Sequence, residues 1–161
     1  MTASDGVSSE HETLRAVLRA IRRRRGLGPR DVALAMGLPL RTYQHFEAGP
    51  SQFNLDRIKA FAKATDSDPY AILAAMMIGS PAFAVRTIDN KLTSVLVDGL
   101  RHFDERLGDA IARLEVGRLI AAFCKAFDDL EGELRARDAQ NRLWMDGAAD
   151  TPPATDEPPE D

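Results

Sequence analysis

Four side chains that can make hydrogen bonds fall within five consecutive residues, at Arg41, Thr42, Gln44 and His45. Guanidinium, hydroxyl, amide and imidazole groups bond to the base edges and phosphate oxygens of DNA. The sequence shows no catalytic triad, no glycine-rich phosphate loop and no metal-ligand spacing of His, Cys, Asp and Glu. These residues therefore predict nucleic-acid recognition, without catalytic residues, metal or cofactor.

Two aromatic residues, Tyr43 and Phe46, lie among the polar ones at a spacing of i, i+3. This spacing gives the stretch one apolar side and predicts a short helix that begins near Pro39 or Leu40 and ends before Gly49. The apolar side should pack inward, which leaves the polar side chains facing outward.

Another short helix is predicted directly before this one. Pro29 after Gly28 suits the first helical position, where a backbone N–H has no intrahelical partner anyway. Gly37 marks the end, because a positive φ costs glycine little. The apolar positions between them are Val32, Ala33 and Met36. Two short helices joined by a tight turn are typical of a DNA-binding helix-turn-helix.

Three further helices are predicted around this pair. The first opens at a capping box at Ser9 and ends in the basic run 22–25, which suits either a helix C-terminus or a solvated face. Its apolar stripe is Leu14, Val17, Leu18 and Ile21. The other two open at the N-cap residues Asn54 and Asp68. The expected result is a compact domain of five helices.

The second half of the chain carries a long apolar pattern with spacings of three or four residues. Ser80 and Pro81 open a helix, and Gly108 and Gly117 are candidate breaks, so two long helices are predicted without a fixed boundary. We expect their apolar face to pair with a second copy, with folding back onto the first domain as the alternative. The predicted dimerisation residues are Leu92, Val95, Leu96, Phe103, Leu107, Ile111, Leu114, Phe123 and Phe127.

The chain of 161 residues is thus predicted to be all-α, with four parts. Residues 1–8 form a disordered N-terminus and residues 9–79 a DNA-binding domain. Residues 80–145 form a helical dimerisation domain, and residues 146–161 a disordered, acidic, proline-rich tail.

The charge of the chain is divided in a similar way. Residues 11–78 hold 11 Lys and Arg against 6 Asp and Glu, whereas residues 79–161 hold 10 against 17. The basic part suits phosphate and the acidic part does not. Cys124 is the only cysteine, which excludes an internal disulfide, and we expect a buried thiol. No signal peptide and no membrane span is visible, so we expect a cytoplasmic protein that joins the nucleoid when bound to DNA.

A family resemblance lies in the order of these features. A basic helix leads through a glycine turn to Ala33 and Gly37, then to RTYQHF, and then to Glu47-Ala48-Gly49. The capped segment NLDRIKAFAKATDSDPYAIL follows. From position 14 to position 73, without a gap, the chain resembles the helix-turn-helix domain of the Xre/Cro (lambda-repressor-like) regulators of bacteria and phages.

The resemblance implies a five-helix fold whose third helix lies in the major groove. The base-contacting residues that it implies are Leu40, Arg41, Gln44 and His45, and the backbone-contacting residues are Arg30, Thr42, Ser51, Gln52, Asn54 and Arg57. Glu47 would help to fix the geometry between the second and third helices. The chain departs from the family at Pro29 or the neighbouring Arg30, where a phosphate-binding Gln is common, and at Pro39, where a capping Ser or Thr is common. More of the positioning must then fall to the other residues.

The function expected from these observations is sequence-specific binding of double-stranded DNA by a transcriptional regulator, most simply a repressor. A homodimer would read a two-fold symmetric operator. The alternative is an antitoxin or another partner-binding protein, whose C-terminal helices bind a second protein.

Overall fold

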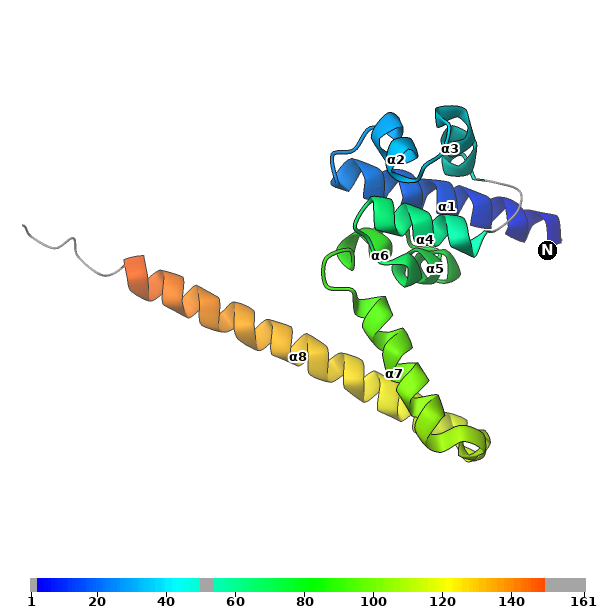
Figure 1. The fold of residues 1–161 in the computed structure, drawn as a ribbon. Coiled ribbons are helices and arrows are strands. Elements are labelled where there is room, and N and C mark those ends of the chain that lie inside the picture. Colours follow the sequence, from blue (N-terminus) through cyan, green and yellow to red (C-terminus); the bar gives the residue numbers. More distant parts are fainter. Residues whose placement is uncertain (1–2, 50–53, 150–161) are drawn as a thin grey trace, which may run out of the picture. The chain divides into compact units, whose positions relative to one another are not determined.

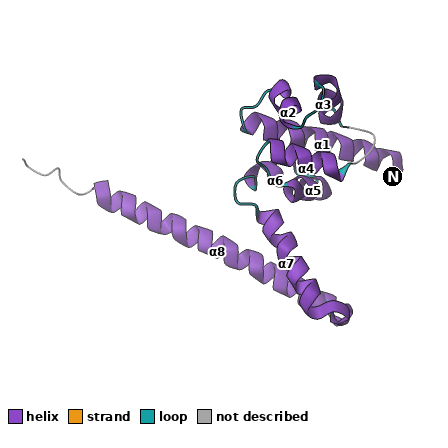
Figure 2. Ribbon diagram, viewed as in Figure 1, coloured by secondary structure: helices purple, strands orange, loops and turns teal. Residues whose placement is uncertain are grey.

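The computed structural model of the chain is all-α, as the sequence predicts. It consists of α-helices and one 3₁₀ segment, and no strand occurs in the described residues, which are 3–49 and 54–149 (Figure 2). The chain divides into two compact units, Met1–Arg106 and Leu107–Asp161. No helix in the described ranges has the length and apolar character needed to cross a membrane.

The five helices predicted for the N-terminal domain are all present (Figure 1). They are α1 (Ala3–Arg24), α2 (Pro29–Ala35), α3 (Leu40–Glu47), α4 (Leu55–Ala64) and α5 (Pro69–Met77). α1 packs against α3 and α5, and α2 packs against α3 and α4. The long first helix thus supports α3 directly, and α2 rests on α3 and α4.

Local capping residues set where these helices begin. The Asn54 side chain accepts the backbone N–H of Arg57 at 2.9 Å, and Pro29 occupies the first turn of α2, both as predicted. The carboxylate of Asp31 reaches back to the N–H of Gly28 at 2.7 Å. The first turn of α2 is therefore capped by a side chain of its own helix.

Glycine is required in the turn of the helix-turn-helix and directly after its second helix. Gly37 follows α2 with φ +65° and Gly49 follows α3 with φ +92°. At Gly49, a Cβ atom would lie 2.9 Å from the carbonyl oxygen of His11, too close for any side chain. The chain therefore leaves α3 against the backbone of α1.

One core joins all five helices. Tyr43 and Phe46 are buried, as their spacing predicts, and Phe46 stacks in a tilted arrangement on Phe61 with ring centroids 6.1 Å apart. Other large side chains of this core are Leu14, Val17, Leu18, Ile21, Val32, Ile58 and Ile72. The short helices α2 and α3 are held by this packing, since helices of their length are unstable alone in water.

The start of α1 differs from the prediction. The helix begins at Ala3, so the predicted start at Ser9 is wrong, and backbone that was expected to be a disordered terminus is helical from Ala3 onward. A capping residue contributes only about 1 kcal/mol, and extending a helix that has already nucleated costs little. A local capping pattern therefore does not by itself stop a helix from running past it.

Two further helices belong to the first unit, whereas the sequence grouped them with the C-terminal part. They are α6 (Pro81–Arg86), which follows Ser80 as predicted, and α7 (Leu92–Leu107). α6 packs against α1 and α5, and Ala84 and Ile88 are buried in the shared core. Burial of these two residues draws the chain after Gly79 back onto the domain.

Asp68 fixes α7 to the N-terminal domain. Its Oδ1 caps α5 by accepting the N–H groups of Tyr70 (2.9 Å) and Ala71 (3.3 Å), as predicted for this position. The same carboxylate accepts the hydroxyl of Ser94 at 2.8 Å and its N–H at 2.9 Å, from the first turn of α7. Two turns further on, Arg101 donates to the Tyr70 hydroxyl at 2.8 Å and lies over that ring. Asp68 thus joins two helices through one buried side chain.

The second unit holds the 3₁₀ segment η1 (Gly108–Arg113) and the long helix α8 (Val116–Ala149). Of the two candidate breaks, Gly108 ends α7 with φ +46°, whereas Gly117 lies inside α8. Cys124 on α8 is exposed, so the expectation of a buried thiol is wrong for the single chain. The predicted disordered tail begins inside α8, which continues to Ala149, and its remainder, 150–161, lies outside the described residues.

Replacing Asp68 with Ala should lower the free energy of unfolding by ~3 kcal/mol, because four hydrogen bonds are lost and their donors are left largely away from water. Urea denaturation followed by circular dichroism measures this change. The control, Asn54→Ala, removes an exposed cap with one bond and should cost ~1 kcal/mol. Equal losses for the two variants would contradict the role of Asp68 as a joint between helices.

Candidate nucleic-acid interface

The outward face of α3 carries the polar side chains that the sequence singled out. Arg41, Gln44 and His45 are exposed, while Tyr43 and Phe46 on the opposite side are buried. This division follows from the helical period, which places residues three or four apart on one side. The outward side of α3 thus presents three hydrogen-bonding side chains to solvent.

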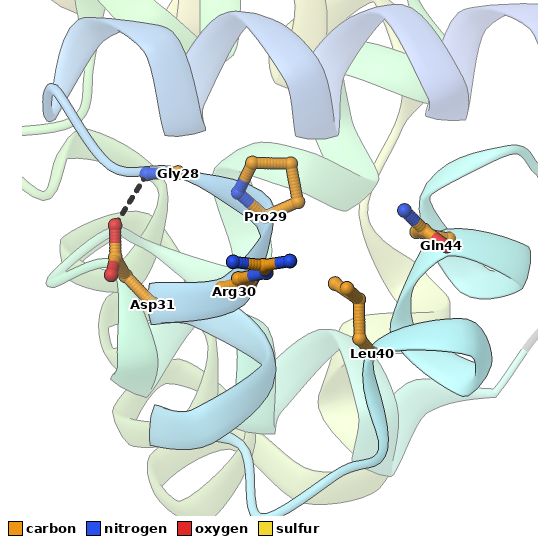
Figure 3. Close-up of a pocket in the computed structure, with 6 residues that line it drawn as sticks. All are labelled: Gly28, Pro29, Arg30, Asp31, Leu40 and Gln44. Atoms are coloured by element: carbon orange, nitrogen blue, oxygen red, sulfur yellow. Dashed lines mark hydrogen bonds between the residues drawn. The ribbon is translucent and has the colours of Figure 1, made fainter.

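A shallow hollow of about 440 Å³ separates the start of α2 from α3 (Figure 3). Pro29 and Arg30 of α2 lie on one side of it, and Leu40 and Gln44 of α3 lie on the other. Leu40 is half-buried because part of its side chain also packs against the core. The hollow therefore brings a cation from one helix beside an amide and an apolar group from the next.

The side chains of this face suit a polyanion whose bases expose hydrogen-bond donors and acceptors. Arg30 and Arg41 offer fixed positive charge, and an arginine fork matches two acceptors on one guanine. Gln44 offers both a donor and an acceptor, which is the pattern that adenine presents in the major groove. In the part of the chain that the structure describes, no group of three or more His, Cys, Asp or Glu could hold a metal ion.

An ion pair beneath this face holds α3 on α1. Arg22 donates to Glu47 through Nε at 2.6 Å and through a terminal nitrogen at 3.3 Å. Its other terminal nitrogen donates to the carbonyl oxygen of Leu27, in the loop before α2, at 3.0 Å. The hydroxyl of Tyr43 also donates to Glu47, at 2.8 Å. Arg22 therefore fixes both the loop that leads into α2 and the end of α3.

Burial and the hydrogen bonds among Arg22, Tyr43 and Glu47 shift the pKa of all three side chains. Burial acts to raise the pKa of Glu47, but the hydrogen bonds from Arg22 and Tyr43 outweigh it and hold that pKa below its usual range. Burial and the hydrogen bond to Glu47 raise the pKa of Tyr43 well above its usual range. The hydrogen bond to Glu47 also raises the pKa of Arg22 against the effect of burial. Glu47 and Arg22 are therefore both charged at neutral pH.

The sequence did not identify these partners. The resemblance implied that Glu47 fixes the second helix to the third, whereas its partners outside α3 are Arg19 and Arg22 of α1. Arg22 also holds the loop before α2. The basic run 22–25 was interpreted as a helix end or a solvated face, yet Arg25 binds the carbonyl oxygen of Thr65 at 3.1 Å and the carboxylate of Asp89 at 2.9 Å. Arg22 in the last turn of α1 and Arg25 directly after the helix lie three apart and are both half-buried, and that spacing is the pattern that could have distinguished them.

The residues implied to contact the DNA backbone have different surroundings. Arg30 is exposed, Thr42 and Arg57 are half-buried, and Asn54 is exposed with its side-chain oxygen engaged in capping α4. Ser51 and Gln52 lie outside the described residues. Of this set, the structure brings Arg30 to the hollow beside α3.

The predicted dimerisation residues fall on both units and are only partly covered. Leu92, Phe103 and Ile111 are half-buried. The exposed members are Val95, Leu96, Leu107, Leu114, Phe123 and Phe127. Within the described residues of the single chain, these exposed side chains have their apolar surface open to water.

Replacing Glu47 with Gln should lower the free energy of unfolding at pH 7 by ~3 kcal/mol, because the variant leaves Arg22 without its charged partner in a largely buried site. Since the pKa of Glu47 is lowered on folding, its contribution is present above the unfolded value and is lost as the pH falls through the folded one. The difference between wild type and variant should therefore shrink below about pH 4. Thermal or urea unfolding across pH 3 to 8 measures it, and a difference that does not depend on pH would contradict the ion pair.

The comparisons with known proteins agree with this geometry. Residues 18–72 match the family model described as Helix-turn-helix. No curated protein and no solved structure matches the chain. The matched segment runs from α1 to α5 and includes α2, α3 and the hollow between them. Over these residues the chain matches a helix-turn-helix domain, which supports DNA binding by a transcriptional regulator of the Xre/Cro (lambda-repressor-like) type.

Proposed function

We propose that the protein binds a specific sequence of double-stranded DNA as a homodimer and acts as a repressor. The observation that carries this proposal is the exposed polar face of α3, with Arg41, Gln44 and His45, beside a hollow that also holds Arg30. This face is backed by a buried aromatic side and by the ion pair to α1. A rigid helix with a polar outer face suits insertion into a major groove.

Each side chain of this face has a role in the proposed complex. Arg41 binds O6 and N7 of a guanine, and Gln44 pairs with an adenine. Leu40 contacts a thymine methyl group, and His45 bonds to a base or a phosphate. These contacts specify the sequence, whereas contacts to phosphate fix the register of the domain on the duplex.

Positioning on the phosphates falls to residues around α3. Arg30 lies across the hollow from Gln44, and Thr42 lies on the flank of α3. Asn54 and Arg57 flank the start of α4, and Ser51 and Gln52 precede it in the sequence. Because α2 begins with Pro29 and its first turn is capped by Asp31, side chains carry more of this positioning than the N-terminus of α2.

Dimerisation would place two recognition helices about 34 Å apart, as adjacent half-sites of a two-fold symmetric operator require. The exposed apolar side chains of α7 and α8 support pairing with a second copy, since they would otherwise remain in water. Repression then needs only that the bound dimer occupies a promoter. Mapping of bound DNA in cells, together with transcript levels in a deletion strain, tests the regulatory direction.

A second candidate function uses the same apolar residues differently. The C-terminal helices could bind a second protein, as in an antitoxin, and their exposed apolar side chains favour this as the runner-up. Purification of the tagged protein from its native cells distinguishes the two, because a stoichiometric hetero-complex would replace the homodimer.

Arg41→Ala should weaken binding to a selected duplex by about 10- to 100-fold and relax the preference at one base pair. The target is first selected from random duplexes with the wild-type protein, and affinities are then measured by fluorescence anisotropy. Arg86→Ala is the matched control, since it removes the same charge from an exposed site on α6. An equal loss on selected and random DNA would remove Arg41 from base recognition.

Salt dependence separates phosphate contacts from base contacts. The affinity should fall steeply as salt rises, and Arg30→Ala should reduce the slope of log K against log salt by about one. That variant should weaken binding to selected and random duplexes to the same extent. A wild-type affinity that does not respond to salt would argue against the proposed DNA complex.

A further inference from the structure

The apolar side chains of α8 follow a stricter rule than simple amphipathicity. Along the first half of this helix the exposed large apolar residues are separated alternately by four and three positions. They are Val116, Ile120, Phe123, Phe127, Leu130 and Leu134. An average spacing of 3.5 residues is the repeat of a coiled-coil seam rather than of a helix that packs on a globular core.

The same alternation continues beyond the last leucine. Arg137, Asn141 and Trp144 follow Leu134 at spacings of three, four and three, and all are exposed. From Val116 to Trp144 the seam spans about four heptads, enough for a coiled coil. An isolated helix of this kind would leave Trp144 and the six apolar side chains that precede it in the seam in water.

We propose that α8 pairs with α8 of a second copy of this chain as a parallel, in-register, two-stranded coiled coil, with the seam running from Val116 to Trp144. The proposal deepens the homodimer put forward above and rests on it for a role in operator binding. It names the surface and the orientation, which the dimer alone does not.

The polar positions of the seam favour the parallel orientation. In parallel register, Asn141 meets its own copy, and an amide that both donates and accepts can pair with itself. Trp144 is then covered by its counterpart. Arg137 also meets its own copy, which places two like charges in one layer. Asp138 of the partner subunit lies beside Arg137 and supplies the opposite charge.

The antiparallel alternative gives fewer residues of the seam a partner on the second helix. It pairs the apolar positions well when Val116 lies opposite Leu134 of the partner subunit. The helix beyond Leu134 then overhangs the partner's α8, so Asn141 and Trp144 meet no counterpart on it.

The positions of α8 outside the seam carry ion pairs within the helix, Lys125 with Asp129 and Arg135 with Glu131, as solvated faces do.

Substitution in the seam tests the pairing in the full-length protein. Phe127→Glu should convert a dimer into a monomer in sedimentation equilibrium, because it places two buried carboxylates against each other. Ala122→Glu introduces the same charge off the seam on the same exposed helix and should leave the dimer intact. The single tryptophan gives a second measure, since Trp144 emission should shift to longer wavelength in Phe127→Glu but not in Ala122→Glu.

Spin labels test the orientation. With Cys124→Ser as background, labels at Arg118→Cys and Ala139→Cys occupy equivalent positions opposite the seam. Parallel pairing predicts equal distances between the two copies at both positions by pulsed electron spin resonance. The antiparallel alternative separates the labels along the helix axis by about 21 Å and about 42 Å respectively, at 1.5 Å per residue.

The outcomes separate this proposal from the proposed function. Clearly unequal label distances, or a Phe127→Glu variant that stays dimeric, would overturn the parallel seam and leave a dimer formed elsewhere. A wild-type chain that is monomeric at micromolar concentration would overturn both the seam and the homodimer, while binding of the helix-turn-helix to a half-site would still be measurable.

Discussion

The guanidinium of Arg22 is the group on which the placement of the polar face of α3 depends. It donates to Glu47 at the end of α3 and to the carbonyl of Leu27 before α2, so one planar group sets the positions of both short helices. Helices of seven and eight residues have little stability of their own. Their placement is therefore imposed by the surrounding helices, and the ion pair between Arg22 and Glu47 contributes to it from beneath the exposed face. The hydroxyl of Tyr43 completes the coordination of Glu47 and ties the aromatic core to the same point.

This arrangement separates the residues that build the domain from those that face outward. Buried aromatic side chains and the ion pair occupy one side of α3, and the polar side chains occupy the other without structural bonds of their own among the described contacts. The outer side chains can therefore vary without loss of the fold. Such a division lets one scaffold serve many target sequences, because specificity resides in side chains that the core does not use.

The sequence predicted what depends on neighbouring residues and missed what depends on distant ones. The ends of the helices followed from Pro29, Asn54, Asp68 and Gly37, whose effects act within a few residues. The inward side of α3 followed from the spacing of Tyr43 and Phe46. In contrast, Arg22 and Glu47 lie 25 residues apart, and Asp68 and Ser94 lie 26 apart, so only the folded chain brings them together. The helical course of residues 3–8 was missed because a capping pattern is a weak local preference.

The shared carboxylate of Asp68 also decides where the chain can bend. Rotation of α7 about the connection after α6 would leave the N–H and the hydroxyl of Ser94 without their acceptor on Asp68, which makes that connection a fixed joint. The next interruption is Gly108, where α7 ends in a left-handed residue and the second compact unit begins close by. The N-terminal domain therefore carries α7 as a rigid arm, and the chain regains rotational freedom only at the segment around Gly108.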